Sequence, residues 1–335
     1  MEKKKLHWGI IGCGNVTEQK SRPAFYRLPE CALVAVMRRD AEKAADYAMR
    51  HGVKKYYTDA ASLIDDPEVE AVYIATPPSS HAELAVQALE KGKPVYVEKP
   101  MATTYAECLA MTEASHRTGM PLYVAYYRRA MEYFRKVKQL VSENAVGKIR
   151  RVELVLRRSL SAADKGMPKP WRLVPAFSGG GYFVDMGAHQ LDLLQFLFGP
   201  VERQESFVAN QGGWYEPEDR VEATFYFGSD VVAHGIWDFA APDGTDDDFI
   251  EITGEAGSLY FSTFSMVPIR LVTGKGEKIF PIPKPEVVEE PMIGQITQEL
   301  LTGNCTASAW ADAVETTRLM EEILKPYYAR LRAAD

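Results

Sequence analysis

Two short motifs, far apart in the chain, carry side chains that could bind an oxygen and move its proton. They are Glu98-Lys99-Pro100 and the run Gly179-Gly180-Gly181 followed by Asp185, His189 and Asp192. If a helix begins just after the glycines, spacings of four and three residues place Asp185, His189 and Asp192 on one face. An amine, a carboxylate and an imidazole would then be available to act on one hydroxyl or carbonyl group.

These residue types suit hydride transfer at a carbinol carbon. The hydroxyl proton must leave or arrive with the hydride, so a group that titrates near neutrality is needed, and His189 is such a group. The Lys99 ammonium can stabilise a developing alkoxide, and Asp185 can bind a hydroxyl. Asp192 can fix the imidazole tautomer. The alternatives are a solvated loop lysine, a core histidine in an apolar helix and a purely structural Asp192.

A glycine-rich turn, residues 12–17, follows the first β-rich run and precedes a helical one. Glycines in this position let the backbone approach a pyrophosphate, so we expect Gly12, Gly14, Asn15 and Val16 to bind a dinucleotide. The third glycine position of the usual fingerprint is occupied by Thr17, which implies a slightly wider spacing between helix and strand. The alternative is a simple tight turn.

The tip of the second strand decides between the two common dinucleotides. It carries Arg38 and Arg39, with Asp40 only afterwards. Because a guanidinium can pair with a 2′-phosphate, whereas an acidic residue binds the ribose hydroxyls, we predict NADP in preference to NAD. In the alternative, both arginines are solvated and Asp40 takes the ribose.

Further residues are expected at the cofactor edge. Thr76, Pro77 and Pro78 follow the next strand as a rigid turn, and His81 either starts a helix or borders the cofactor. No ligand of suitable spacing accompanies His81, so we expect no metal there. The acidic run 243–248 could suggest a cation site, but a solvated hairpin loop is favoured because the EF-hand spacing is missing.

The elements that position these residues are of two kinds. Residues 1–125 alternate short apolar runs with helical ones, which is typical of a parallel sheet covered on both faces. The expected strands are 6–11, 32–37, 71–75, 94–97 and 122–125. The helix after Pro100 should start at the capping box of Thr104 and Glu107 and end at Gly119. This half is predicted to be a Rossmann, doubly wound parallel-sheet domain.

Residues 126–335 are predicted to form an α+β domain for substrate binding and oligomerisation. Longer β-type runs form a large, mostly antiparallel open sheet. The expected strands are 148–158, 220–227, 230–239, 249–253 and 258–264, and a final helix should span 310–331. Large side chains point both ways in 223–227, so the sheet face opposite the helix of residues 181–198 needs a cover. A second subunit is the simplest cover, which predicts a homodimer or homotetramer formed through this sheet.

Composition limits the classes of partner. The chain has 335 residues, 46% hydrophobic and 25% charged, with a formal net charge of −7, which argues against a nucleic-acid surface. The four cysteines, Cys13, Cys31, Cys108 and Cys305, form no CxxC pair, and no apolar run could span a membrane. We therefore expect a cytoplasmic protein with a small-molecule substrate, no metal, no nucleic acid and no membrane partner.

In their order along the chain, the glycine turn, the Thr76 to His81 segment, the Glu98-Lys99-Pro100 motif and the Asp185 to Asp192 motif resemble the Gfo/Idh/MocA oxidoreductases. That family includes glucose-fructose oxidoreductase and inositol dehydrogenase. The resemblance covers nearly the whole length. It implies a nicotinamide ring facing a pocket beneath the second sheet.

The resemblance also implies roles for individual residues. Lys99 would contact the substrate oxygen and the cofactor, Asp185 would orient the substrate, and His189 would be the general acid/base. Glu98 and Arg172 would border the cofactor. The substrate side of the pocket would be lined by Tyr127, Arg128 and Trp171. The predicted function is NAD(P)-dependent oxidation or reduction of a sugar, polyol or related compound. Two alternatives remain: a redox-assisted lyase or glycosidase, and a non-catalytic dinucleotide sensor.

Overall fold

The computed structural model describes residues 5–228, 230–304 and 311–334, which fall into two compact units. The first unit comprises Met1–Met131 and Pro285–Thr317, and the second comprises Glu132–Lys284 and Arg318–Asp335. The chain therefore returns to the first unit after building the second, whereas the sequence analysis places a single boundary after residue 125.

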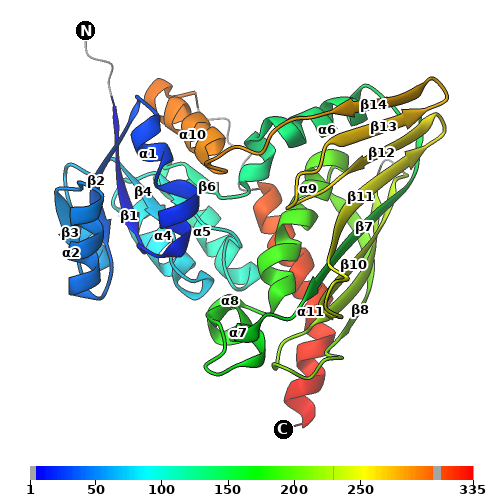
Figure 1. Ribbon diagram of the computed structural model, residues 1–335. Helices are drawn as coiled ribbons and strands as arrows, with labels where there is room; N and C mark the ends of the chain where they lie inside the picture. The colour runs from blue at the N-terminus through cyan, green and yellow to red at the C-terminus, as the bar shows by residue number, and fades with distance from the viewer. Residues whose placement is uncertain (1–4, 229, 305–310, 335) are drawn as a thin grey trace. The chain divides into compact units, whose positions relative to one another are not determined.

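The first unit is built on a parallel sheet with the strand order β3-β2-β1-β4-β5-β6 (Figure 1). Its strands are β1 (Leu6–Ile11), β2 (Cys31–Met37), β3 (Lys55–Tyr57), β4 (Ala71–Ile74), β5 (Val95–Val97) and β6 (Leu122–Val124). β4 and β5 are buried along their whole length, as expected for strands covered on both faces. The predicted doubly wound sheet is thus confirmed, and it adds β3, whose three residues are too few for a recognisable pattern.

Helices cover this sheet. They are η1 (Thr17–Ser21), α1 (Ala24–Arg27), α2 (Ala41–Arg50), α3 (Ala60–Ile64), η2 (Pro78–Ser80), α4 (His81–Glu90), α5 (Tyr105–Thr118), η3 (Tyr127–Ala130) and α10 (Glu290–Thr302). The predicted capping box of α5 is present, because the Thr104 and Glu107 side chains each bind the other's backbone amide. Gly119 ends α5 in the left-handed conformation, with φ of 70°.

The second unit contains an eight-stranded sheet with the order β14-β13-β12-β11-β7-β10-β9-β8. Its strands are β7 (Ile149–Ser159), β8 (Val201–Ala209), β9 (Arg220–Phe227), β10 (Val232–Ala241), β11 (Asp247–Gly254), β12 (Gly257–Phe261), β13 (Ile269–Thr273) and β14 (Gly276–Phe280). Neighbouring strands are antiparallel except β7 and β10. The predicted large, mostly antiparallel sheet is confirmed.

Helices complete the second unit (Figure 1). They are α6 (Glu132–Ser142), α7 (Ala162–Lys165), η4 (Trp171–Leu173), α8 (Pro175–Ser178), η5 (Phe183–Gly187), α9 (Ala188–Phe198) and the part of α11 (Ala311–Ala334) from Arg318 onward. The indole N–H of Trp237 on β10 donates to the Gln190 side chain at 2.6 Å. The centres of the Trp237 and Phe183 rings lie 4.9 Å apart. These contacts fix the start of α9 against the sheet.

Two expectations need correction. β8, β13 and β14 were not predicted, since charged residues interrupt their apolar pattern. The acidic run 243–248 is not wholly a solvated loop, because β11 begins at Asp247. The Asp248 carboxylate there accepts the backbone amides of Thr263 and Phe264. Trp310 and Cys305 lie outside the described residues. None of the described helices is long and apolar enough to cross a membrane.

Candidate active site

In the first unit, the predicted cofactor residues and the predicted substrate residues Tyr127 and Arg128 follow strands at one edge of the sheet. The strands are parallel, so the residues that follow them meet at the carboxyl edge, where ligands of open α/β sheets bind. These residues are Gly12–Val16 after β1, Arg38–Arg39 after β2, Thr76–Pro78 after β4, Glu98–Lys99 after β5 and Tyr127–Arg128 after β6. β1 and β4 are neighbours, so the glycine turn and the Thr76 turn flank the point where the strand order reverses.

The glycine turn combines one closely packed position with one open position. Gly12 has φ of 99°, and a Cβ there would come within 2.8 Å of the Ala75 carbonyl group and of Thr76. At Gly14 a Cβ would meet no described atom within 4 Å. Thr17 is buried, and its hydroxyl donates to the Gly14 carbonyl at 2.8 Å. The turn is therefore held firmly while leaving the space at Gly14 that a pyrophosphate needs.

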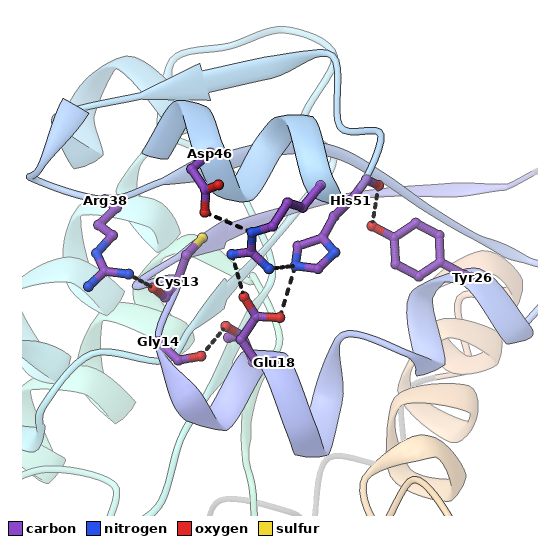
Figure 2. A network of polar contacts seen from close by, with 9 residues as sticks. Cys13, Gly14, Glu18, Tyr26, Arg38, Asp46 and His51 are labelled. Carbon is purple, nitrogen blue, oxygen red and sulfur yellow. Dashed lines mark hydrogen bonds and ion pairs between the residues drawn. The ribbon is translucent and has the colours of Figure 1, made fainter. Parts of the chain in front are cut away.

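Arg38 lies beside this turn, where its Nη1 donates to the Cys13 carbonyl at 2.8 Å (Figure 2). Asp40 is engaged elsewhere, since its carboxylate accepts the Lys43 amide as the N-cap of α2 and pairs with the Lys43 ammonium at 2.8 Å. The Lys43 side chain and amide lower the pKa of Asp40. Arg39 is exposed. The alternative in which Asp40 turns toward a ribose would require it to leave its helix cap.

A second set of polar contacts holds the helix that follows the turn (Figure 2). Glu18 of η1 accepts Arg50 at 2.8 Å and contacts the His51 ring at 2.9 Å, and Arg50 also pairs with Asp46. Burial opposes ionisation of Glu18, but the hydrogen bonds from Arg50 and His51 outweigh it and lower its pKa. This network ties η1 to the end of α2.

His81 is the first residue of α4, as one of its two predicted roles required. Its ring is fully buried, with Nε2 2.8 Å from the Thr76 carbonyl and Nδ1 3.1 Å from the Pro100 carbonyl. Burial lowers the pKa of His81, although the two carbonyls and Glu98 oppose this. The ring therefore links the turn after β4 to the turn that carries Lys99.

Behind Lys99, the first unit buries a pair of carboxyl groups. The Tyr73 hydroxyl donates to Glu98 at 2.6 Å, and the Tyr96 hydroxyl donates to Glu289 at 3.3 Å. Glu289 has no exposed surface, and burial, followed by the neighbouring Glu98, raises its pKa well above the usual range. Burial and the neighbouring Glu98 thus both favour the neutral form of Glu289. Sequence reasoning missed this residue because 216 positions separate it from Tyr73.

In the second unit, the structure brings Arg172 and Asp185 together. Arg172 Nε donates to Asp185 Oδ2 at 2.9 Å, and the guanidinium lies 4.5 Å from the centre of the Trp171 ring. Trp171 is 37% exposed, which leaves part of the ring available to a ligand. Indole, guanidinium and carboxylate are thus arranged in one cluster suited to a polyhydroxylated molecule.

The predicted helix after the glycines is present, but its first turn differs from a regular α-helix. Asp185 lies in η5, a π-helical turn, and His189 is the second residue of α9. A Cβ at Gly187 would lie 2.6 Å from the Phe183 ring, so this glycine allows the wide turn to close. His189 is 4% exposed, and the centre of its ring lies 6.0 Å from the centre of the Phe264 ring. Asp192 is buried one turn further on.

The glycine triplet is anchored by another residue that the sequence did not reveal. The Gly181 amide donates to Glu218 Oε1 at 2.9 Å, and the Tyr328 hydroxyl donates to Oε2 at 2.7 Å. The one available signal is that Glu218 and Asp219 stand immediately before an apolar strand. Lys99, Tyr127 and Arg128 belong to the first unit, and the groups around Asp185 belong to the second.

Among the described residues, no cluster of three or more His, Cys, Asp or Glu side chains is arranged to hold a metal ion.

Known proteins resemble the chain along nearly its whole length. A family model described as "Oxidoreductase family, NAD-binding Rossmann fold" matches residues 6–126, and the "GFO/IDH/MocA C-terminal domain" matches residues 134–260. Oxidoreductase P35 of Formosa agariphila is 38% identical over 320 residues, covering 95% of this chain and 98% of that protein.

Two further relatives have named activities. Levoglucosan dehydrogenase of Pseudarthrobacter phenanthrenivorans is 32% identical over 205 residues, covering 58% of this chain and 52% of that protein. The crystal structure of aldose-aldose oxidoreductase from Caulobacter crescentus, complexed with glycerol, has a TM-score of 0.84 at 26% identity and covers 96% of this chain and 97% of that one.

Proposed function

Because the chain belongs to the GFO/IDH/MocA oxidoreductase family, we propose that it transfers a hydride between a nicotinamide dinucleotide and a CH–OH or carbonyl group of a sugar or polyol. The chain is a dehydrogenase or reductase with an NAD-binding Rossmann fold. The observation that carries the proposal is the open space at Gly14, on the carboxyl edge that also carries Lys99. Relatives named as dehydrogenases favour this function over the lyase and sensor alternatives.

The residues of the first unit fit a dinucleotide. Gly12 and Gly14 would let the backbone approach the pyrophosphate, with Asn15 and Val16 starting the helix that follows. We propose that NADP is preferred to NAD, with Arg38 and Arg39 binding the 2′-phosphate. Two observations support this preference: Arg38 lies against the turn, and Asp40 is held in its helix cap.

Other residues complete the proposed cofactor site. The turn of Thr76, Pro77 and Pro78 would lie along the dinucleotide, held by His81. Glu98 and Lys99 would approach the nicotinamide end, and Arg172 would border it. The cofactor, when bound, supplies the hydride acceptor or donor. The chain itself supplies binding, orientation and proton transfer.

We assign the proton chemistry to the second unit. His189 would accept the hydroxyl proton during oxidation and return it during reduction, and its burial keeps competing water away. Asp185 would bind a neighbouring hydroxyl, and Arg172 holds this carboxylate in place. The Lys99 ammonium would stabilise negative charge on the reacting oxygen.

The proposed substrate class is a sugar, a polyol or a closely related compound. Trp171 offers a partly exposed indole on which a sugar ring could stack, and we propose Tyr127 and Arg128 as further substrate-binding residues. Relatives named levoglucosan dehydrogenase and inositol 2-dehydrogenase act on compounds of this class. A screen of sugars and polyols with each cofactor, read at the absorbance band of the reduced nicotinamide, would identify the substrate.

We also propose that the chain forms a homodimer or homotetramer through its eight-stranded sheet. Strands β9 and β10 alternate buried and half-exposed residues, and the buried face packs on α9. The other face carries two large apolar side chains that are more than half exposed, Phe207 and Ile279. Light scattering on the purified protein would give the mass in solution, and a monomer at micromolar concentration would contradict this proposal.

The decisive test is His189→Ala. Loss of the proton acceptor should reduce kcat by at least roughly a hundredfold, while affinity for the dinucleotide stays nearly unchanged. Rapid-mixing kinetics would measure the first, and fluorescence titration with the reduced dinucleotide the second. An unchanged turnover would remove His189 from the mechanism.

The cofactor preference has a separate test. Arg38→Asp replaces the proposed phosphate ligand with a group that repels the 2′-phosphate, so the ratio of kcat/KM for NADP over NAD should fall. If both cofactors respond equally, the phosphate pairing is wrong and the hydride-transfer proposal still stands.

A further inference from the structure

A continuous set of hydrogen bonds runs from the C-terminal helix to the backbone of Asp185. Tyr328 of α11 donates to Glu218 Oε2 at 2.7 Å, and Glu218 Oε1 accepts the Gly181 amide at 2.9 Å. The carbonyl of the same glycine accepts the Asp185 amide at 3.4 Å. Gly181 is therefore held through its amide by a carboxylate and through its carbonyl by the turn that bears Asp185.

The packing around Gly181 leaves no room for a side chain. A Cβ at this position would lie 2.9 Å from the Glu218 carbonyl oxygen and 2.9 Å from Pro217. At Gly180, a Cβ would lie 2.5 Å from Val184 and 3.3 Å from Leu324 of α11. Glu218 itself has no exposed surface. The Glu218 carboxyl is thus in direct hydrogen-bond contact with the Gly181 amide inside closely packed surroundings.

Glu218 is the charged group in this arrangement whose state can change near neutral pH. Burial raises its pKa to about 7, opposed by the hydrogen bonds from Tyr328 and Gly181 and reinforced by the nearby Asp219. The other titratable groups around it are Tyr215 and Glu216 of its own loop and Tyr327 of α11. Only the ionised carboxylate makes charge-assisted bonds to both donors.

We propose that Glu218 is a positioning residue for Asp185 and His189, acting through the Gly181 peptide, and that its ionisation couples the geometry of this turn to pH. The inference rests on the proposed function, in which Asp185 binds substrate and His189 moves the proton. Ionised Glu218 accepts a charge-assisted hydrogen bond from the Gly181 amide and fixes the turn. The neutral acid accepts a weaker hydrogen bond from this amide, so the turn orients the substrate less well.

Three variants separate this role from a purely structural one. Glu218→Gln keeps the shape and one acceptor but cannot ionise. Tyr328→Phe keeps the carboxyl and removes one donor, so Glu218 should ionise at a pH higher by about one unit. The matched control is Tyr327→Phe, because the Tyr327 hydroxyl donates to the Glu216 carbonyl and not to Glu218.

The first readout needs no substrate. In ¹⁵N spectra of the full-length protein, the amide signals of Gly181 and Asp185 should titrate together with a midpoint near neutral pH. The titration should vanish in Glu218→Gln, move to higher pH in Tyr328→Phe and stay in place in Tyr327→Phe. If the Asp185 amide does not titrate, or if Tyr328→Phe leaves the midpoint unchanged, the inference is overturned. If Glu218→Gln folds poorly, Tyr328→Phe decides alone.

The second readout is the pH profile of kcat and KM with a turned-over polyol. Above the midpoint, Glu218→Gln should show a KM several-fold higher than the unmodified protein, and below it the two should agree. Turnover with identical profiles contradicts the positioning role and leaves the proposed function intact. Absence of turnover with all substrates contradicts the proposed function, while the amide titration still tests Glu218.

Discussion

The two units each contain a glycine-rich turn followed by a π-helical turn, but the glycines are there for opposite reasons. In the first unit Gly14 faces open space and precedes η1. In the second, Gly180 and Gly181 are enclosed by Val184, Pro217 and Glu218 and precede η5. A glycine whose Cα faces open space leaves room for a ligand. A glycine whose Cα faces other backbone atoms permits close packing within the protein.

The same contrast extends to the acidic groups behind each turn. Glu18, behind the first turn, is paired with Arg50 and His51, and its pKa is lowered. Glu218, behind the second, receives only uncharged donors, and burial raises its pKa. The first turn is therefore braced by a permanent charge pair, whereas the second depends on a carboxyl that changes state.

The largest effect is expected in the pH dependence of stability. The pKa of Glu218 is about 7 in the folded protein and 4.5 by default, so the folded state holds the proton more tightly. The stabilisation that this bound proton gives to the folded state is complete below pH 4.5 and is lost as the pH rises through 7. Relative to Glu218→Gln, the unmodified protein should lose about 3 kcal/mol between these limits. Urea unfolding at a series of pH values measures this, and a constant difference would contradict the raised pKa.

The next largest effect is expected from Gly181→Ala. The added methyl group would overlap the backbone oxygen of Glu218, so the free energy of unfolding should fall by about 2 kcal/mol. Gly14→Ala is the matched substitution in the other turn and should change it by less than about 0.5 kcal/mol. Chemical denaturation of both variants gives the comparison directly. Equal losses would show that the two turns do not differ as described.

Gly14→Ala should instead affect ligand binding. A methyl group in the open space would obstruct the approach of a pyrophosphate, so dinucleotide affinity should weaken roughly tenfold, with thermal stability of the ligand-free protein nearly unchanged. Isothermal titration calorimetry measures the affinity. Unaltered binding would mean that the space at Gly14 serves another purpose.

The smallest effect is expected from Asp40→Ala. Because this carboxylate caps α2, its removal should lower Tm slightly and leave the ratio of kcat/KM for the two cofactors unchanged. Steady-state kinetics with NADP and NAD test the second part. A marked rise in NADP preference would identify Asp40 as a ribose ligand after all.

The fold was predictable where local chemistry decides structure. The limits of β1 and β9 and the capping box of α5 follow from apolar runs and from the Thr104 to Glu107 spacing. Edge strands such as β14 were not predicted. One side of β14 is exposed, and Glu277 and Lys278 interrupt its apolar pattern.

The candidate site was predictable in part for the same reason. Gly12, Lys99 and His189 stand in short motifs, so their residue types and neighbours identify them. Glu218 and Glu289 do not, because their roles come from partners that only the folded chain brings close. A buried carboxyl has no local signature, and its pKa is set by the surrounding atoms.

The return of residues 285–317 to the first unit determines which fragment of the chain could be expressed as the first unit alone. Glu289 lies beneath Tyr73 and Tyr96, and Thr297 of α10 contacts Cys31 of β2 at 3.2 Å. A fragment that stops at Met131 would lack Glu289, which contacts both tyrosines, and Thr297, which contacts Cys31. The dinucleotide half cannot be excised with a single cut. A version that joins Met131 to Pro285 through a short linker is the minimal piece to express.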